Sequence, residues 1–136
     1  MALLLDTHFF LWLMLQDKNI SLKEQELIAE YAKNNQLLVS AISIWEIAFL
    51  VKLGRVHLYE PTTIWIEQAL KTPGLTLAPL TPAILCESVV LPGDLHKDPA
   101  DRMIVATARL NQARLLTRDG KILEYAKQGF IDCVVS

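Results

Sequence analysis

The sequence lacks the features of secreted, disulfide-stabilised and strongly basic proteins. It has only two cysteines in 136 residues, Cys86 and Cys133, with neither metal-type spacing nor the number that a disulfide framework needs. The formal net charge is −2, so the protein as a whole does not attract nucleic acid, and any such binding needs a local basic rim. We expect both cysteines to be reduced core residues of a cytoplasmic protein.

The chain also has no apolar run long enough to cross a membrane. Residues 3–15 are apolar, but they have no basic leader, are interrupted by Asp6 and are too short to span a bilayer. Neither secretion nor a membrane partner is expected.

The length fits one domain over residues 1–136, large enough to bury roughly two-thirds of the surface of the unfolded chain. Hydrophobic residues make up 52% of the sequence, which is on the apolar side for a soluble domain. The surplus predicts a surface covered by another subunit or a partner, and we expect a homodimer.

Short apolar runs alternate with helical patterns along the chain. We expect strands at residues 2–5, 37–39, 75–80, 115–117 and 133–135, and helices at residues 7–15, 21–33, 40–53, 61–70, from 82, at 98–111 and from 119 or 120. This alternation predicts an α/β fold with a mostly parallel sheet.

Four acids lie where a strand gives way to a helix or within such a helix: Asp6, Glu46, Asp101 and Asp119. In an open parallel α/β sheet the carboxyl ends of the strands share one crevice, so these acids can converge there. Converging carboxylates repel each other unless a cation joins them, and a metal held by carboxylates commonly acts on phosphate.

Each acid has a competing structural interpretation. Asp6 follows a strand and, taken alone, is better explained as a helix N-cap. Asp119 is followed by Gly120, and an acid followed by glycine is also typical of a plain turn or a helix cap. Asp98, before Pro99 at the first helical position, is the natural N-cap of its helix, so we assign Asp98 to capping and Asp101 to chemistry.

Glu46 interrupts an apolar helix face, which is costly for a carboxylate that is neither paired nor bound to metal. On a helical wheel its neighbours are Ile42, Phe49, Leu50 and Leu53. The alternative is a capping box with Ser43, but Ser40 follows the strand directly and is the better cap. We therefore favour a functional role for Glu46.

The histidines and tryptophans give weaker signals. The three histidines have no metal-type spacing, so a surface or hydrogen-bonded role is expected for each. Trp12, Trp45 and Trp65 occupy helical positions, where packing in the core is the better interpretation.

Taken together and in order, these motifs resemble PIN-domain ribonucleases of the VapC toxin type. The matching segments are residues 4–8 with Leu11 and Trp12, residues 43–47, residues 96–102 running into 104–108, and residues 116–119. The resemblance implies a PIN-like three-layer α/β/α sandwich around a central, mostly parallel, twisted sheet of four to five strands.

The resemblance also implies an endoribonuclease that depends on Mg²⁺ or Mn²⁺ and acts as the toxin of a toxin-antitoxin pair, blocked by a small antitoxin protein. By motif position, Asp6, Glu46 and Asp101 correspond to the three principal metal-binding acids and Asp119 to the fourth. Thr117 matches a small polar position near the pocket.

Metal-assisted hydrolysis of RNA would need cations around an acidic pocket. Arg102 and Lys97, beside the start of the helix that carries Asp101, are the first choices; the other candidates are Lys52, Arg55, Arg109, Arg118 and Lys121.

Two non-cleaving alternatives remain. A receiver-like signalling domain also has an acidic Mg²⁺ pocket, but it needs paired acids after the first strand, where this chain has only Asp6. A catalytically silent PIN scaffold is the other, although the intact acids argue against it.

Overall fold

The computed structural model describes residues 1–134 and has a parallel sheet at its centre. The strands are β1 (Leu3–Leu5), β2 (Leu37–Ser40), β3 (Leu75–Ala78), β4 (Arg114–Leu116) and β5 (Asp132–Cys133). They form one five-stranded sheet in the order β3-β2-β1-β4-β5, and every neighbouring pair is parallel. The expected α/β fold with a mostly parallel sheet is confirmed.

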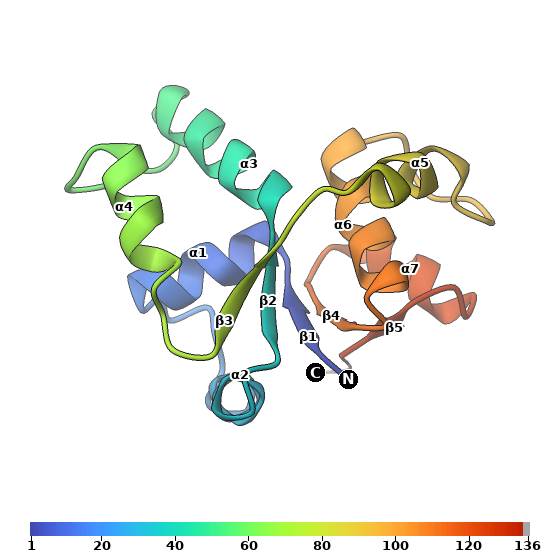
Figure 1. The fold of residues 1–136 in the computed structure, drawn as a ribbon, viewed down its shortest axis with the longest axis horizontal. Coiled ribbons are helices and arrows are strands. Elements are labelled where there is room, and N and C mark those ends of the chain that lie inside the picture. Colours follow the sequence, from blue (N-terminus) through green and yellow to red (C-terminus); the bar gives the residue numbers. More distant parts are fainter. Residues whose placement is uncertain (135–136) are drawn as a thin grey trace.

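Helices cover both faces of this sheet (Figure 1). They are α1 (Thr7–Leu15), α2 (Leu22–Lys33), α3 (Ala41–Lys52), α4 (Thr62–Ala69), α5 (Pro82–Val90), α6 (Pro99–Leu110) and α7 (Gly120–Lys127). None of the helices in the described part of the chain is long and apolar enough to cross a membrane.

The two helical layers follow from the alternation of side chains along β1. Leu3 and Leu5 join a core cluster with residues of α1 to α4, whereas Leu4 joins a second cluster with residues of α5, α6 and α7. Because successive side chains of a strand point to opposite faces, an all-leucine strand supplies both cores. The three-layer α/β/α sandwich is therefore confirmed.

The expected helix caps are present. The side chains of Asp6, Ser40 and Asp98 accept backbone hydrogen bonds at the starts of α1, α3 and α6. Ser21 and Glu24 form a complete capping box at the start of α2. Since α3 begins at Ala41, directly after Ser40, a capping box between Ser43 and Glu46 is excluded.

Strand ends differ slightly from expectation. β3 ends at Ala78 because Pro79 has no N–H to donate to a neighbouring strand. β4 ends at Leu116, so Thr117 lies just beyond the sheet. β5 covers Asp132–Cys133, while Val135, the expected last strand residue, lies outside the described residues.

Two burial expectations are wrong. Cys86 is exposed on α5, and only Cys133 is a core cysteine. Trp45 is 59% exposed on α3, where it stacks on Phe49, which is also exposed, with ring centroids 5.3 Å apart. Helical spacing alone did not show that this face of α3 is turned away from the sheet.

The strand order places a crevice at the middle of the sheet. β1 lies between β2 and β4, so the connections that follow β1 and β4 lead to opposite faces of the sheet (Figure 1). In open α/β sheets ligands bind at such a switch point, outside the carboxyl ends of the strands. Asp6 directly follows β1, and Asp119 follows β4 by three residues.

Candidate functional site

All four candidate acids line one pocket of about 420 Å³ at this crevice. They come from four different parts of the fold: the end of β1, the middle of α3, the first turn of α6 and the start of α7. The other lining residues are Thr7, His8, Trp12, Asp98, Ile104 and Arg118. The convergence expected from the strand and helix pattern is therefore present in the structure.

Asp6 is both a helix cap and a pocket residue. Its Oδ1 accepts a hydrogen bond from the backbone N–H of Phe9 at 2.9 Å, and its Oδ2 accepts one from the hydroxyl of Thr117 at 2.6 Å. Burial raises the pKa of Asp6, although these two hydrogen bonds act in the opposite direction. Asp6 caps α1 through Oδ1, whereas Oδ2 is the oxygen held by Thr117 at the pocket. The capping role and the functional role of Asp6 are thus compatible.

Glu46 is held by the first turn of α1. The Thr7 hydroxyl donates to Glu46 Oε1 at 2.5 Å and also lies 2.8 Å from the hydroxyl of Ser43. Burial raises the pKa of Glu46, and repulsion from Asp101 adds to the shift. The carboxyl therefore lies in the pocket, anchored by a buried hydroxyl.

Glu46 does not interrupt a buried helix face, contrary to the expectation from the helical wheel. Phe49 and Leu53 on its helical face are exposed, and the fully buried residues of α3 are Ser43 and Ile47. Glu46 therefore does not interrupt the core-facing stripe but lies at its edge, where α3 borders the pocket.

Asp101 contacts a histidine that the sequence did not single out. Nε2 of His96 lies 2.7 Å from Asp101 Oδ2, which confirms a hydrogen-bonded role for His96. Burial raises the pKa of Asp101, and repulsion from Asp98 and Asp119 acts in the same direction. Asp98 caps α6 as expected, yet it also lines the pocket and adds to its negative charge.

Asp119 is the acid most engaged by backbone. Its Oδ1 accepts hydrogen bonds from the N–H groups of Lys121 at 2.9 Å and Ile122 at 3.0 Å, so it caps α7. Its own N–H donates to Thr117 Oγ1 at 3.1 Å, which links it to the hydroxyl that holds Asp6. Thr117, the small polar residue that the resemblance puts near the pocket, thus contacts two of the four acids but is not itself among the residues that line the pocket.

The pocket has the donor chemistry of a divalent metal centre without being a preformed one. Within residues 1–134, no three acidic, histidine or cysteine side chains lie close enough together to hold an ion as they stand. The three acids with raised pKa values are each held by a neighbouring hydroxyl or imidazole. Hard carboxylate oxygens that repel one another suit Mg²⁺ or Mn²⁺.

The two preferred RNA-binding cations do not line this pocket. The guanidinium of Arg102 donates to the backbone carbonyls of Ser88 at 2.8 Å and Leu95 at 3.0 Å, so it ties α5 and the following loop to α6. Lys97 is exposed on that loop and is also absent from the pocket wall. Arg118 is the cation that lines the pocket, and the available signal was its position between Thr117 and Asp119.

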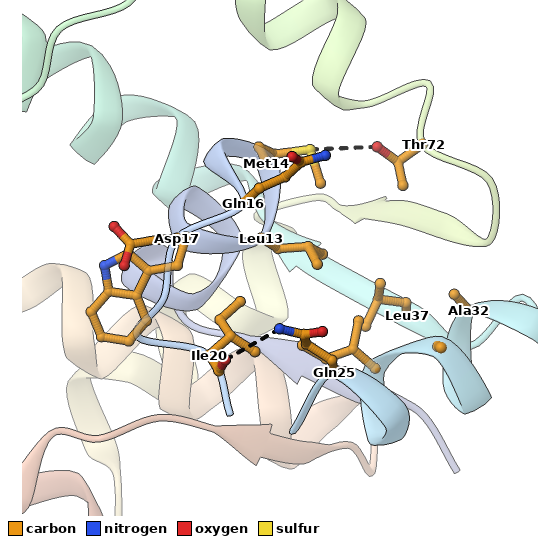
Figure 2. Close-up of a pocket in the computed structure, with 12 residues that line it drawn as sticks. Leu13, Met14, Gln16, Asp17, Ile20, Gln25, Ala32, Leu37 and Thr72 are labelled. Carbon is orange, nitrogen blue, oxygen red and sulfur yellow. Dashed lines mark hydrogen bonds between the residues drawn. The ribbon is translucent and has the colours of Figure 1, made fainter. Parts of the chain in front are cut away.

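A larger cavity of about 570 Å³ lies elsewhere and has a different character. Figure 2 shows Leu13 and Met14 of α1, Gln25 of α2 and Thr72 around it. Its lining is mainly apolar, and it contains none of the four acids. Trp12 lines both cavities, so the apolar one adjoins the acidic one.

Comparison with known proteins agrees with this geometry. The family model of the PIN domain matches residues 3–128. Ribonuclease VapC22 of Mycobacterium tuberculosis (strain ATCC 25618 / H37Rv) is 34% identical in an alignment over 124 residues that covers 89% of each chain.

Solved structures show the same fold at low sequence identity. VapBC2 from Rickettsia felis, bound to a promoter DNA fragment, matches with a TM-score of 0.67 at 15% identity, over 98% of both chains. A toxin-antitoxin complex from Klebsiella pneumoniae matches with a TM-score of 0.65 at 18% identity, over 98% of this chain and 97% of that one. The chain belongs to the PIN-domain family and, within it, to the VapC type.

Proposed function

We propose that this protein is a metal-dependent endoribonuclease that hydrolyses RNA phosphodiester bonds and acts as the toxin of a toxin-antitoxin pair. The observation that carries the proposal is the convergence of Asp6, Glu46, Asp101 and Asp119 on one pocket. A 34% identical relative named as a ribonuclease supports the reaction class.

In this proposal Asp6 and Asp101 are the central ligands of Mg²⁺ or Mn²⁺, while Glu46 and Asp119 hold a second ion or orient water. A bound ion would lower the pKa of a water molecule and offset charge that develops on the phosphate. The chain's own contribution is to hold the carboxylates: Thr117 for Asp6, Thr7 for Glu46 and His96 for Asp101. Such contacts orient ligands, and hydrogen bonds of this kind favour the ionised form of a carboxyl group against the effect of its burial.

The test is incubation of purified, antitoxin-free protein with total cellular RNA, with Mg²⁺ or Mn²⁺ and with EDTA. Asp6→Asn and Asp101→Asn are compared with Asp94→Asn, which changes an exposed acid outside the pocket. We expect cleavage that needs metal and is lost in the two pocket variants alone. Cleavage that survives chelation or either pocket substitution would refute this mechanism.

The same assay separates the enzyme from non-cleaving alternatives. A receiver-like domain needs a lysine at its acidic pocket, and no lysine lines this one within the described residues. A silent PIN scaffold would leave all RNA intact under every metal condition. If the assay shows metal-dependent cleavage, both the receiver-like domain and the silent PIN scaffold are excluded.

A small antitoxin is the proposed protein partner. Solved structures of the same fold include toxin-antitoxin complexes, and the apolar cavity beside the acidic pocket offers a surface for an apolar segment. We expect the protein encoded next to this one to co-purify with it and to suppress its ribonuclease activity. Full activity in the presence of that bound protein would contradict the assignment.

Self-association is proposed from the apolar surface of α3 and α5. Large apolar side chains are exposed there: Trp45, Phe49, Leu53, Leu85 and Val89. We expect a homodimer in light scattering and a monomer for Phe49→Glu. A wild-type monomer at micromolar concentration would refute this proposal.

A further inference from the structure

One wall of the acidic pocket carries a guanidinium held from three sides. Arg118 is the only arginine or lysine among the described residues that line the pocket. Its guanidinium carbon lies 5.0 Å from the ring centroid of Phe9 and 5.3 Å from that of Trp12. Both distances are within the range of a cation–π interaction, so α1 restrains the guanidinium.

The third restraint is a carboxylate on α2. Arg118 Nη2 donates to Oε1 of Glu24, 94 residues earlier in the chain. Glu24 is only 3% exposed, which shows that it does not belong to a solvated face of α2. Its Oε1 also accepts the N–H of Ser21 at 2.9 Å, so the carboxylate that holds Arg118 is itself fixed by the capping box.

This arrangement leaves most of the arginine's binding capacity unused. A guanidinium has five N–H donors, and within the described residues the contact with Glu24 is the only hydrogen bond from the Arg118 side chain. The side chain remains 39% exposed. Buried Glu24 Oε2 has no hydrogen-bond partner in residues 1–134, so the pair is joined through one oxygen only.

We infer that Arg118 is a phosphate-binding residue of this pocket, and that buried Glu24 is its positioning residue. The inference rests on the proposed ribonuclease function and names a contact to the RNA backbone. A pre-oriented guanidinium fork matches the geometry of a phosphate and binds it through two parallel hydrogen bonds. In a pocket whose lining includes five carboxylates, this cation offsets the repulsion of the RNA strand.

The measurement is the salt dependence of binding to a labelled oligouridylate, in an Asp101→Asn background that prevents turnover. Arg118→Met should weaken binding about tenfold. It should also reduce, by about 0.7, the steepness of the plot of the logarithm of the association constant against the logarithm of the salt concentration, which is the value for one phosphate contact on a single strand. Lys71→Met removes an exposed lysine outside the pocket and should leave the slope unchanged. Arg118→Lys should keep the slope but not the full affinity.

Glu24→Gln distinguishes positioning from direct contact. This variant keeps the charge of Arg118 and weakens the contact that positions its guanidinium. The affinity for the oligouridylate should therefore fall a few-fold, and the slope of the salt dependence should stay unchanged. If Arg118→Met fails to fold because Glu24 is left buried and unpaired, the double variant with Glu24→Gln removes that charge and is measured instead. A slope equal to the wild-type value in a folded Arg118→Met or double variant would overturn the inference.

The outcome is separable from the proposed function. Absence of metal-dependent cleavage by the wild-type protein contradicts the ribonuclease proposal, whatever the slopes show. Cleavage by the wild type with no change in slope contradicts only the role of Arg118.

Discussion

Thr117 connects β4 to β1 at the pocket: its hydroxyl donates to Asp6 Oδ2 at 2.6 Å and accepts the N–H of Asp119 at 3.1 Å. Asp6 and Thr117 are 111 positions apart in sequence, but they extend neighbouring strands of the sheet. One buried hydroxyl therefore orients one candidate ligand and fixes the turn that carries another.

Thr117→Val tests this connection. Valine keeps the shape and removes the hydroxyl, so Asp6 loses a donor that holds its carboxylate. We expect activity or metal affinity to fall by about 10- to 100-fold, as for other residues that orient metal ligands. Metal titration of the cleavage rate measures the effect.

Thr107→Val is the matched control, because Thr107 is equally buried but bonds only within α6, to the carbonyl of Met103. A similar loss in both variants would assign the effect to stability instead of the pocket.

The acids should make the metal-free fold weaker as pH rises. Burial raises the pKa of Asp6, Glu46 and Asp101, so these groups ionise at lower pH in the unfolded chain, and this ionisation stabilises the unfolded state relative to the folded one. Stability is therefore lost as pH rises from the ordinary carboxyl range through the raised folded pKa values. The melting temperature of Asp101→Asn should lie a few degrees above that of the wild type near pH 7. In acid the two melting temperatures should be equal.

Mg²⁺ should remove this difference, because it binds the ionised carboxylates of the folded protein. Thermal melts at several pH values, with EDTA and with Mg²⁺, check both expectations. Equal melting of wild type and Asp101→Asn across the whole pH range without metal would contradict them.

Arg102 should contribute to stability, in contrast to Arg118. Its guanidinium satisfies carbonyls at the end of α5 and in the following loop. Arg102→Met leaves those acceptors unpaired and should cost about 1–3 kcal/mol of unfolding free energy in denaturant titration. The salt dependence of RNA binding should stay at the wild-type value, and a reduced slope would restore Arg102 as a phosphate contact.

Two glycines with positive φ should differ in their tolerance of alanine. Gly74 has φ +81, and a Cβ there would lie 1.9 Å from the carbonyl oxygen of Ala32, whereas Gly54 has φ +74 with open space around it. Gly54→Ala should cost roughly 1–2 kcal/mol of backbone strain.

Gly74→Ala must in addition move α2 away from the start of β3, so we expect a loss above about 4 kcal/mol. Chemical denaturation of the two variants measures the difference. Equal costs would show that the chain before β3 adjusts without moving α2.

The local sequence was sufficient for most of the fold. Alternation of apolar runs with helical patterns, and acids or hydroxyls at the helix starts, predicted the helices and their caps, because hydrophobic spacing and capping act over a few residues. It also determined that Asp6 and Asp119 follow strands that can meet at one edge. The helical positions of Glu46 and Asp101 indicated functional roles for those two acids, whereas Asp6 and Asp119, each explicable as a cap, gained a functional interpretation mainly from the family resemblance.

Only the tertiary structure decided which charges share the pocket. Helical spacing could not show that Arg102 is occupied by backbone carbonyls, that Glu24 is buried, or that Arg118 lies over two aromatic rings. These contacts join residues from separate elements, and their strength depends on distance and burial, which follow from packing and not from neighbours along the chain.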